Sequence, residues 1–283
     1  MKKLNIVLFL ILLLQSFGYA ETNKNQKIIE YSVKWDRRKF IIAITNTVPM
    51  SEKSLPSLKF ILENRNRTDL PYIILNGIRK LTIDSKTKGN KYITEHPNTI
   101  EAILDLADDF TKESSIFSLD FKSLVTIYSI NIYPDIAGLF LNDSRTTMLT
   151  PDLNFVPSAT FSGIVIYVDA KLPLYGKHST GNYSPCLFPK VYNEQLDLIA
   201  APLMVNPEII RKEGTVGYQS SVKTLDLARI GHSPLKIKAR GIFGINNTDL
   251  IISTRDAEKI LSRMENLELI KQGKILIVYE PTS

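Results

Sequence analysis

The stretch that decides the fold reads IEYSVKWDRRKFIIAIT over residues 29–45. Apolar residues occupy every second position from Ile29 to Trp35, which is the period-two signature of a strand with one buried face. Asp36–Arg38 supplies a turn, and residues 40–45 form a second run rich in β-branched side chains. The sequence therefore predicts that a β-hairpin opens the folded part of the chain.

Helices and further strands are expected to follow this hairpin. A helix capped by Ser54 should break near Asp69, because Pro71 lacks an N–H and its ring clashes with the preceding turn. Gly77 is expected to stop helical structure ahead of a strand. The expected elements after it are a strand, a helix with a capping-box-like start and two more strands, over residues 78–83, 98–110, 117–121 and 124–133. This order predicts an α+β module over residues 21–140, with helices against one antiparallel sheet.

The second half is expected to form another module of the same class. Turn residues break the periodicity of residues 141–160 for longer than an ordinary connection, which predicts a linker. Residues 161–283 then predict a second α+β module, in which an antiparallel or mixed sheet packs with a few helices. Ser253 is expected to cap a helix, and the expected strands are residues 161–168, 188–198, 235–243, 249–252 and 274–280.

The first twenty residues have the pattern of a secretory signal peptide. Lys2 and Lys3 precede an unbroken apolar run from Ile6 to Leu14, and small residues at positions 18 and 20 predict cleavage after Ala20. That run is shorter than the roughly 20 residues that span a bilayer, and no later stretch is long and apolar enough. We therefore expect an exported, periplasmic chain that has no transmembrane segment once the signal is removed.

The charge and the cysteine content limit which partners and modifications are expected. The 35 basic and 29 acidic residues give a net charge of +6, and their spread along the chain favours weak attraction to anionic surfaces over nucleic-acid binding. The single cysteine, Cys186, does not follow the expected cleavage point, so no lipoprotein is expected. It is interpreted as an inert packed thiol, with a nucleophile or a mixed disulfide as the alternatives.

The side chains that could carry chemistry form no recognised motif. The histidines, residues 96, 178 and 232, lack the spacing of metal ligands, and no G-x-S-x-G sequence marks a nucleophile. Asp169 could orient His178, but a structural loop formed by Asp169, Gly176 and Gly181 is the simpler reading. The sequence therefore predicts neither a catalytic residue, nor a metal, nor a cofactor, and the protein is expected not to be an enzyme.

A basic stripe is the candidate contact surface. Lys236, Lys238 and Arg240 alternate with apolar residues, so all three are expected to point outward from one strand. They could contact peptidoglycan, an anionic lipid surface or an acidic partner, although a solvated strand face has the same pattern. Edge strands of either sheet could instead accept a partner's strand.

The second half also resembles a known family. The shared segments are an apolar strand ending in Asp-Ala, a Pro-containing strand, a Gly-Tyr pair, a Pro-Leu-x-x-Lys-Ala strand and a helix cap, found here at residues 161–170, 186–194, 217–218, 233–239 and 248–257. These resemble an exported envelope family related to flagellum-associated lipoproteins of the flagellar assembly protein P type. Lys171-Leu172 replaces that family's Arg-Gly, Pro71 interrupts its long helix, and its lipid-bearing cysteine is absent.

The resemblance implies a structural or adaptor role in the cell envelope, around the flagellar basal body. Together with the signal peptide, it predicts a non-enzymatic periplasmic adaptor that binds envelope or flagellar proteins. Two alternatives remain open. One is an envelope hydrolase or small-ligand-binding protein with a pocket near residues 169–184, and the other is a module that binds peptidoglycan or an anionic surface.

Overall fold

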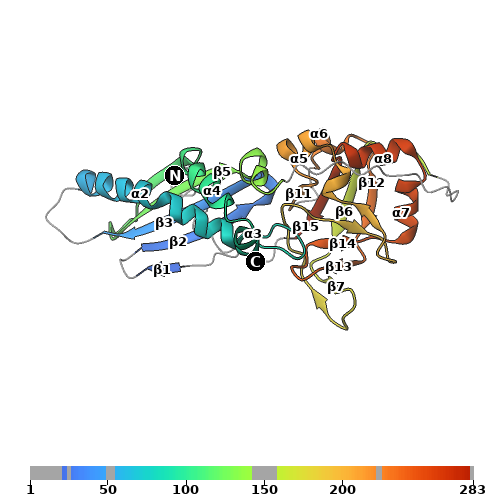
Figure 1. Ribbon diagram of the computed structural model, residues 1–283, viewed down its shortest axis with the longest axis horizontal. Helices are drawn as coiled ribbons and strands as arrows, with labels where there is room; N and C mark the ends of the chain where they lie inside the picture. Colours follow the sequence, from blue (N-terminus) through green and yellow to red (C-terminus); the bar gives the residue numbers. More distant parts are fainter. Residues whose placement is uncertain (1–20, 24–26, 49–54, 142–157, 221–224, 281–283) are drawn as a thin grey trace. The chain divides into compact units, whose positions relative to one another are not determined.

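The computed structural model describes residues 21–23, 27–48, 55–141, 158–220 and 225–280, so the expected signal peptide and most of the expected linker lie outside them. The chain divides into two compact units (Figure 1). Unit 1 combines residues up to 80 with residues 93–135, and unit 2 combines residues 81–92 with the chain from residue 136 onward. Each unit holds helices and at least one sheet, which confirms the α+β class.

Unit 1 is built on a five-stranded sheet in the order β1-β2-β3-β5-β4, and every neighbouring pair is antiparallel. The expected opening hairpin is confirmed as β2 and β3. The strands are β1 (Glu21–Asn23), β2 (Lys27–Lys34), β3 (Lys39–Thr47), β4 (Thr111–Phe117) and β5 (Ser123–Asn131). Even-numbered residues of β3 and β5, such as Ile42, Ile44, Leu124 and Ile130, form the buried face of this sheet.

One long helix, α2 (Leu55–Lys80), covers that face, and the predicted break near Asp69 is wrong. The helix continues through Pro71, although a proline inside a helix costs about 3 kcal/mol. Burial of Leu70, Ile74 and other apolar residues on both sides of the proline offsets this cost. The strand predicted over residues 78–83 is also wrong, because α2 extends to Lys80.

Gly77 lies inside α2 instead of ending it, for a reason of packing. A Cβ at this position would lie 2.6 Å from the Tyr31 ring and 2.9 Å from the Phe40 ring. Only glycine lets the helix approach β2 and β3 this closely. The signal that suggested a helix stop therefore marks a close contact between helix and sheet.

The remaining helical segments of the first half are short. They are η2 (Trp35–Arg37), α3 (Gly89–Glu95), α4 (Thr99–Asp105), η3 (Leu106–Asp108) and η4 (Ile132–Ile136). The helix expected over residues 98–110 is confirmed as α4 followed by η3. Its expected cap is wrong, since Asn98 has helical backbone angles and its side chain caps nothing.

Unit 2 contains two four-stranded sheets. In the first, ordered β11-β15-β6-β12, all neighbours are parallel; its strands are β6 (Ile164–Val168), β11 (Gly217–Gln219), β12 (Leu235–Lys238) and β15 (Ile275–Tyr279). The second is mixed and ordered β10-β9-β14-β13; its strands are β9 (Val191–Tyr192), β10 (Leu198–Ala200), β13 (Gly241–Phe243) and β14 (Asp249–Ile251). A small hairpin pairs β7 (Leu172–Pro173) with β8 (Thr180–Gly181).

Two strands predicted as continuous are divided in the structure. Residues 235–243 form β12 in the parallel sheet and then β13 in the mixed sheet. The chain changes sheets between them, since the amide of Ala239 bonds to Tyr167 and the amide of Arg240 bonds to Ile251. Residues 188–198 likewise contribute only β9 and the first residue of β10.

Helices complete unit 2. They are η5 (Pro202–Met204), α5 (Pro207–Glu213), α6 (Leu227–Ile230), α7 (Thr254–Leu261) and α8 (Met264–Lys271). The buried guanidinium of Arg229 donates to four backbone carbonyls, those of Glu213, Gly214, Gly273 and Ile275. It thereby joins the end of α5 to the start of β15. Among the helices in the described part of the chain, none is long and apolar enough to cross a membrane.

The segment of residues 81–92 packs within unit 2, although the sequence analysis placed it in the first module. The amide of Phe188 bonds to the Ile83 carbonyl at 2.9 Å, and the Asn246 side chain bonds to the Asp84 carbonyl at 2.9 Å. The amide of Asn246 also bonds to the Ser85 carbonyl. Unit 2 is therefore assembled from two separate stretches of sequence.

Candidate functional site

The basic stripe is exposed, and one of its three charges is paired. Lys236, Lys238 and Arg240 alternate with buried Leu235, Ile237 and Ala239, as the sequence pattern indicates. Lys238 forms a 2.9 Å ion pair with Asp169, which reduces the net positive charge of the stripe and weakens the case for an anion-binding face.

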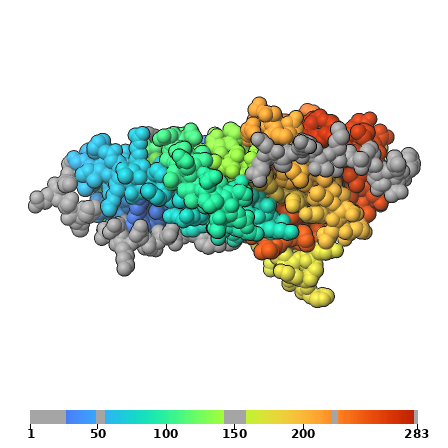
Figure 2. All heavy atoms as spheres, viewed as in Figure 1, coloured from blue at the N-terminus to red at the C-terminus, as the bar shows by residue number. Residues whose placement is uncertain are grey.

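Gly176 and Gly181 belong to the β7–β8 hairpin, which projects from the surface of unit 2 and is seen in yellow in Figure 2, whereas Asp169 lies just after β6 and before this hairpin. Gly176 has φ +75°, a left-handed conformation that favours glycine, and Gly181 lies in β8. Asp169 and His178 are both exposed, and no hydrogen bond joins them within the described residues. Two hollows in the described part of the chain, one in unit 1 and one beside the start of α7, are lined by residues outside 169–184.

Cys186 is buried beneath a cluster of tyrosines. The Tyr218 hydroxyl donates to the Cys186 carbonyl at 2.9 Å, and the Cys186 amide donates back to that hydroxyl at 3.3 Å. Burial raises the pKa of the Cys186 thiol well above its usual range, so the reactive thiolate is suppressed. This environment fits the packed thiol that the sequence analysis expected.

Asp249 is a buried carboxylate that the sequence analysis did not single out. Its Oδ1 atom accepts a 3.1 Å bond from the Lys190 amide, whereas its Oδ2 atom is buried without a hydrogen-bond partner. Burial is the main cause that raises the pKa of this carboxyl. The Thr248 hydroxyl also donates to Oδ1 at 3.4 Å, and the Ser85 side chain lowers the pKa of this carboxyl by less than burial raises it.

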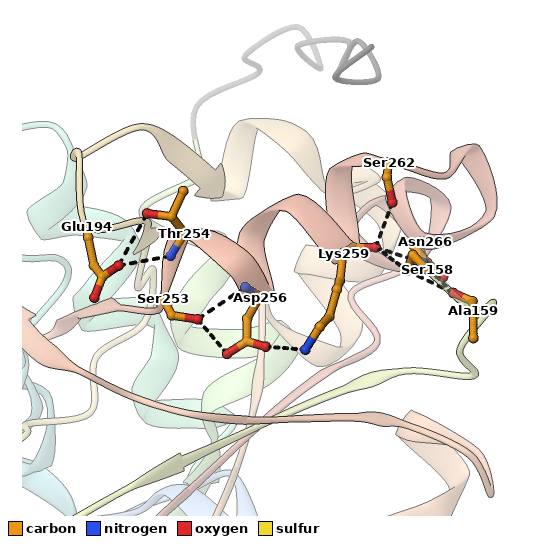
Figure 3. A network of polar contacts seen from close by, with 9 residues as sticks. All are labelled: Ser158, Ala159, Glu194, Ser253, Thr254, Asp256, Lys259, Ser262 and Asn266. Carbon is orange, nitrogen blue, oxygen red and sulfur yellow. Dashed lines mark hydrogen bonds and ion pairs between the residues drawn. The ribbon is translucent and has the colours of Figure 1, made fainter. Parts of the chain in front are cut away.

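A polar network surrounds the start of α7 (Figure 3). Ser253 caps the helix by accepting from the Asp256 amide, which confirms the predicted cap. Glu194 accepts from the backbone and hydroxyl of Thr254, and Asp256 forms a 2.8 Å ion pair with Lys259. Asn266 donates to the Lys259 and Ala159 carbonyls. These polar groups satisfy one another, so the network holds α7, α8 and the chain before β6 in place.

An exposed apolar surface lies on unit 1, at the turn between β4 and β5. Leu119 is 86% exposed and Phe121 is 54% exposed, and Ile116 on β4 is exposed too. We call Leu119 and Phe121 the hairpin tip. On the buried side, Phe117 anchors the hairpin by packing against Val48, Leu58, Leu62 and Leu124.

The hairpin tip is rigidly built. The Ser118 hydroxyl donates to Asp120 at 2.7 Å and accepts from the Ser123 amide at 3.0 Å, and the Phe121 amide donates to the Ser118 carbonyl at 3.0 Å. Phe121 has φ +56°, a left-handed conformation that bulky side chains rarely adopt. The turn therefore holds two large apolar side chains at the surface in spite of the backbone strain at Phe121.

Sequence reasoning missed the hairpin tip because it assigned residues 117–121 to a strand. The string Ser118-Leu-Asp-Phe-Lys122 contains turn-favouring Ser and Asp, but no glycine or Asn-Gly pair marks the reversal. Phe117, Leu119 and Phe121 alternate as the residues of one strand face do, so the pattern itself favours a strand, and Ser118 and Asp120 were the available signal for a turn.

Fold and surface together define a two-unit α+β protein whose described polar clusters serve structure and whose hairpin tip is exposed. Residues 27–139 match the family model described as Treponema pallidum Tp0624, N-terminal domain. Residues 163–281 match the model described as Treponema pallidum Tp0624, second domain. The two matches occur in the order of those domain names and together span most of the chain, so each half is similar to one domain of that treponemal protein.

Neither family description names an activity, a ligand or a partner. Neither refers to flagellar assembly protein P, so that resemblance stays a prediction. A search of the curated proteins finds no match to the chain.

Proposed function

We propose that this chain is a non-enzymatic adaptor of the cell envelope, exported by its N-terminal signal, and that it binds another envelope protein through the hairpin tip. The single observation that supports this most strongly is the exposure of Leu119 and Phe121 on an ordered turn. Exposed large apolar residues that a fold holds rigidly are typical of protein-protein contact sites.

The energetic reasoning favours a protein partner with an apolar cleft. Burying a leucine or phenylalanine side chain contributes about 1.5–3 kcal/mol each, which is the scale of an interface hot spot. Because the turn is already ordered, binding loses little conformational entropy there. The charged groups beside the tip, Asp120 and Lys122, are 3.8 Å apart and compensate each other, so they favour a partner surface of low charge.

Affinity capture from detergent-solubilised envelopes tests this proposal. The mature chain is immobilised in its native form and as the double variant Leu119→Ser, Phe121→Ser, and retained proteins are identified by mass spectrometry. We expect at least one envelope protein to be retained by the native chain and reduced about tenfold or more by the double variant. A flagellar protein among these would support the flagellar setting implied by the resemblance.

The matched control is the double variant Leu203→Ser, Ile245→Ser, which removes two exposed apolar side chains from unit 2. It should retain the same proteins as the native chain. Equal retention by all three baits, or no envelope protein retained by any, would contradict the proposal.

A further inference from the structure

Strand β4 forms one edge of the unit 1 sheet, and its outer side is open. Within the described residues it pairs with β5 alone, and no backbone hydrogen bond joins it to any other segment. With residues 111–117, it is also the longest edge strand in the described part of the chain. An open edge of this kind offers backbone donors and acceptors to another strand.

Only the first part of this edge is protected against pairing. Proteins commonly keep edge strands apart with charged side chains, prolines and bulges. Lys112 and Glu113 are charged, and the register between β4 and β5 shifts between Lys112 and Ser114. Residues 114–117 contain no charge and no proline, and their register with β5 is regular. The second half of β4 is therefore an unprotected edge.

The hairpin determines which backbone groups of this half point outward. The Ser118 amide donates at 2.8 Å to the carbonyl of the first residue of β5, so the backbone of Ser118 faces β5. Along an antiparallel pair, successive residues direct their backbone groups alternately toward the partner strand and away from it. Ile116 and Ser114 therefore also face β5, whereas Phe117 and Ser115 direct their N–H and C=O groups to the open side.

These outward groups match a second copy of the same strand. When two β4 strands run antiparallel with Ile116 opposite Ile116, Ser115 of each copy lies opposite Phe117 of the other. All of these residues direct their backbone groups outward, so each of the two pairs exchanges both of its hydrogen bonds. The two Ile116 residues form a pair without backbone bonds, which is the arrangement that brings side chains closest together.

The side chains of this edge favour a second copy as the occupant. Ile116 is 55% exposed, so its contact with the same residue of another copy buries apolar surface. Lys112 and Glu113 lie before the paired stretch, and Asp120 and Lys122 lie beyond it. Each end thus carries one acidic and one basic side chain. Antiparallel pairing brings unlike ends together without an excess of either charge.

We propose that the chain forms a weak dimer in which two β4 strands pair antiparallel about Ile116 and join two unit 1 sheets into one. Strand addition at an open sheet edge is a recurring mode of protein association. A contact limited to residues 114–117 is smaller than the roughly 800 Å² per partner of a stable interface, so we expect a dissociation constant of about 100 µM. This contact goes beyond the proposed adaptor function, and either can fail without the other.

Sedimentation equilibrium of the purified mature chain, from about 10 µM to about 1 mM, measures this association. Ile116→Lys and Ile116→Glu should each weaken it about tenfold or more, because each variant places two like charges directly opposite one another. An equal mixture of the two variants should associate about tenfold more tightly than either alone, since lysine then lies opposite glutamate. Only a contact in which residue 116 meets itself predicts this recovery.

Ile28→Lys is the matched control. Ile28 is exposed and lies in the same cross-strand row as Ile116, but on β2 instead of β4. This variant adds the same charge to the same face of the sheet and should dimerise like the native chain. The double variant Leu119→Ser, Phe121→Ser should dimerise too, which separates this contact from apolar association through the hairpin tip.

Amide hydrogen exchange at low and high protein concentration locates the contact. The amides of Ser115 and Phe117 should become protected as the dimer forms, whereas those of Ser114 and Ile116 already bond to β5. This protection and the recovery in the mixture would support the proposal.

Three results would overturn it. One is a native chain that stays monomeric up to about 1 mM. Another is a mixture of the Ile116 variants that associates no better than each variant alone. The third is association that either control, Ile28→Lys or the double variant of the hairpin tip, weakens as much as Ile116→Lys does.

Discussion

At the scale of single residues, buried polar groups of this protein serve the fold, and most have partners. Arg229 uses its guanidinium to hold four carbonyls, and Asn266 bridges two. Leaving such groups without partners would cost about 1–3 kcal/mol each. Asp249 differs, because one of its carboxylate oxygens is buried without a partner.

Asp249 gives a prediction about pH. Its pKa is raised in the folded protein, so the folded state binds the proton more tightly than the unfolded state. Its contribution to stability is therefore full below the unfolded pKa of about 3.9 and is lost as the pH rises through the folded pKa. Asp249→Asn keeps an oxygen for the Lys190 amide and removes this loss. The variant should be more stable than the native chain at pH 7, by about 1 kcal/mol.

Urea unfolding of both proteins at pH 7 and pH 4 measures this difference. The gap should narrow at pH 4, because the raised pKa of Asp249 makes the native carboxyl more protonated there than at pH 7. Asp169→Asn, at an exposed ion pair, should change stability by less than about 0.5 kcal/mol at either pH. A variant at Asp249 that is less stable than the native chain at pH 7 would show that the ionised carboxylate is favourable there.

At the scale of elements, the β4–β5 hairpin combines a strained turn with an anchored base. Phe121 occupies the left-handed region, and its ring centroid lies 6.2 Å from that of Phe117, which is partly buried against the core. Asparagine adopts that region more readily than phenylalanine does. Relief of this strain should offset the lost contact with the Phe117 ring, so Phe121→Asn should leave the free energy of unfolding within about 0.5 kcal/mol of native, while Phe117→Asn should lower it by about 3 kcal/mol.

Thermal and urea unfolding of the two variants compare these costs directly. If Phe121→Asn lost as much stability as Phe117→Asn, the Phe121 ring would contribute to the core. The hairpin tip would then not be an exposed surface whose backbone strain lowers stability. A stable Phe121→Asn variant that no longer binds the partner would show that strain is retained for binding.

Element predictions succeeded where local patterns agree with packing. The alternation in residues 29–45 predicts β2 and β3, and Ser253 predicts the start of α7, because each depends on neighbours in sequence. The errors have tertiary causes. Pro71 and Gly77 lie inside α2 because packing against the sheet stabilises a continuous helix. Residues 235–243 divide because their first part pairs in the parallel sheet and their last part pairs in the mixed sheet.

The candidate surface residues were likewise predicted correctly only where a local sequence pattern determines their position. Outward positions for Lys236, Lys238 and Arg240 follow from alternation alone, and the structure places all three on the surface. The ion pair between Lys238 and Asp169 required the fold, since this carboxylate is distant in sequence.

At the scale of the whole molecule, two units of the same class combine separate stretches of the chain. Unit 2 takes in residues 81–92 by hydrogen bonds to residues 188 and 246, so the chain alternates between units. The sequence predicts only one connection between the units, because turn-rich composition marks residues 141–160 and nothing similar marks residues 81–92. In the structure the chain passes between the two units more than once.

We propose that the protein is an adaptor that binds through its hairpin tip, and photocrosslinking in living cells detects that contact at the residue itself. A photoreactive phenylalanine analogue replaces Leu119 in one strain and the similarly exposed Ile245, 82% exposed on unit 2, in another. We expect a discrete adduct with one envelope protein from position 119 and none of that size from position 245. No adduct from position 119, or the same adducts from both positions, would rule out the hairpin tip as the contact.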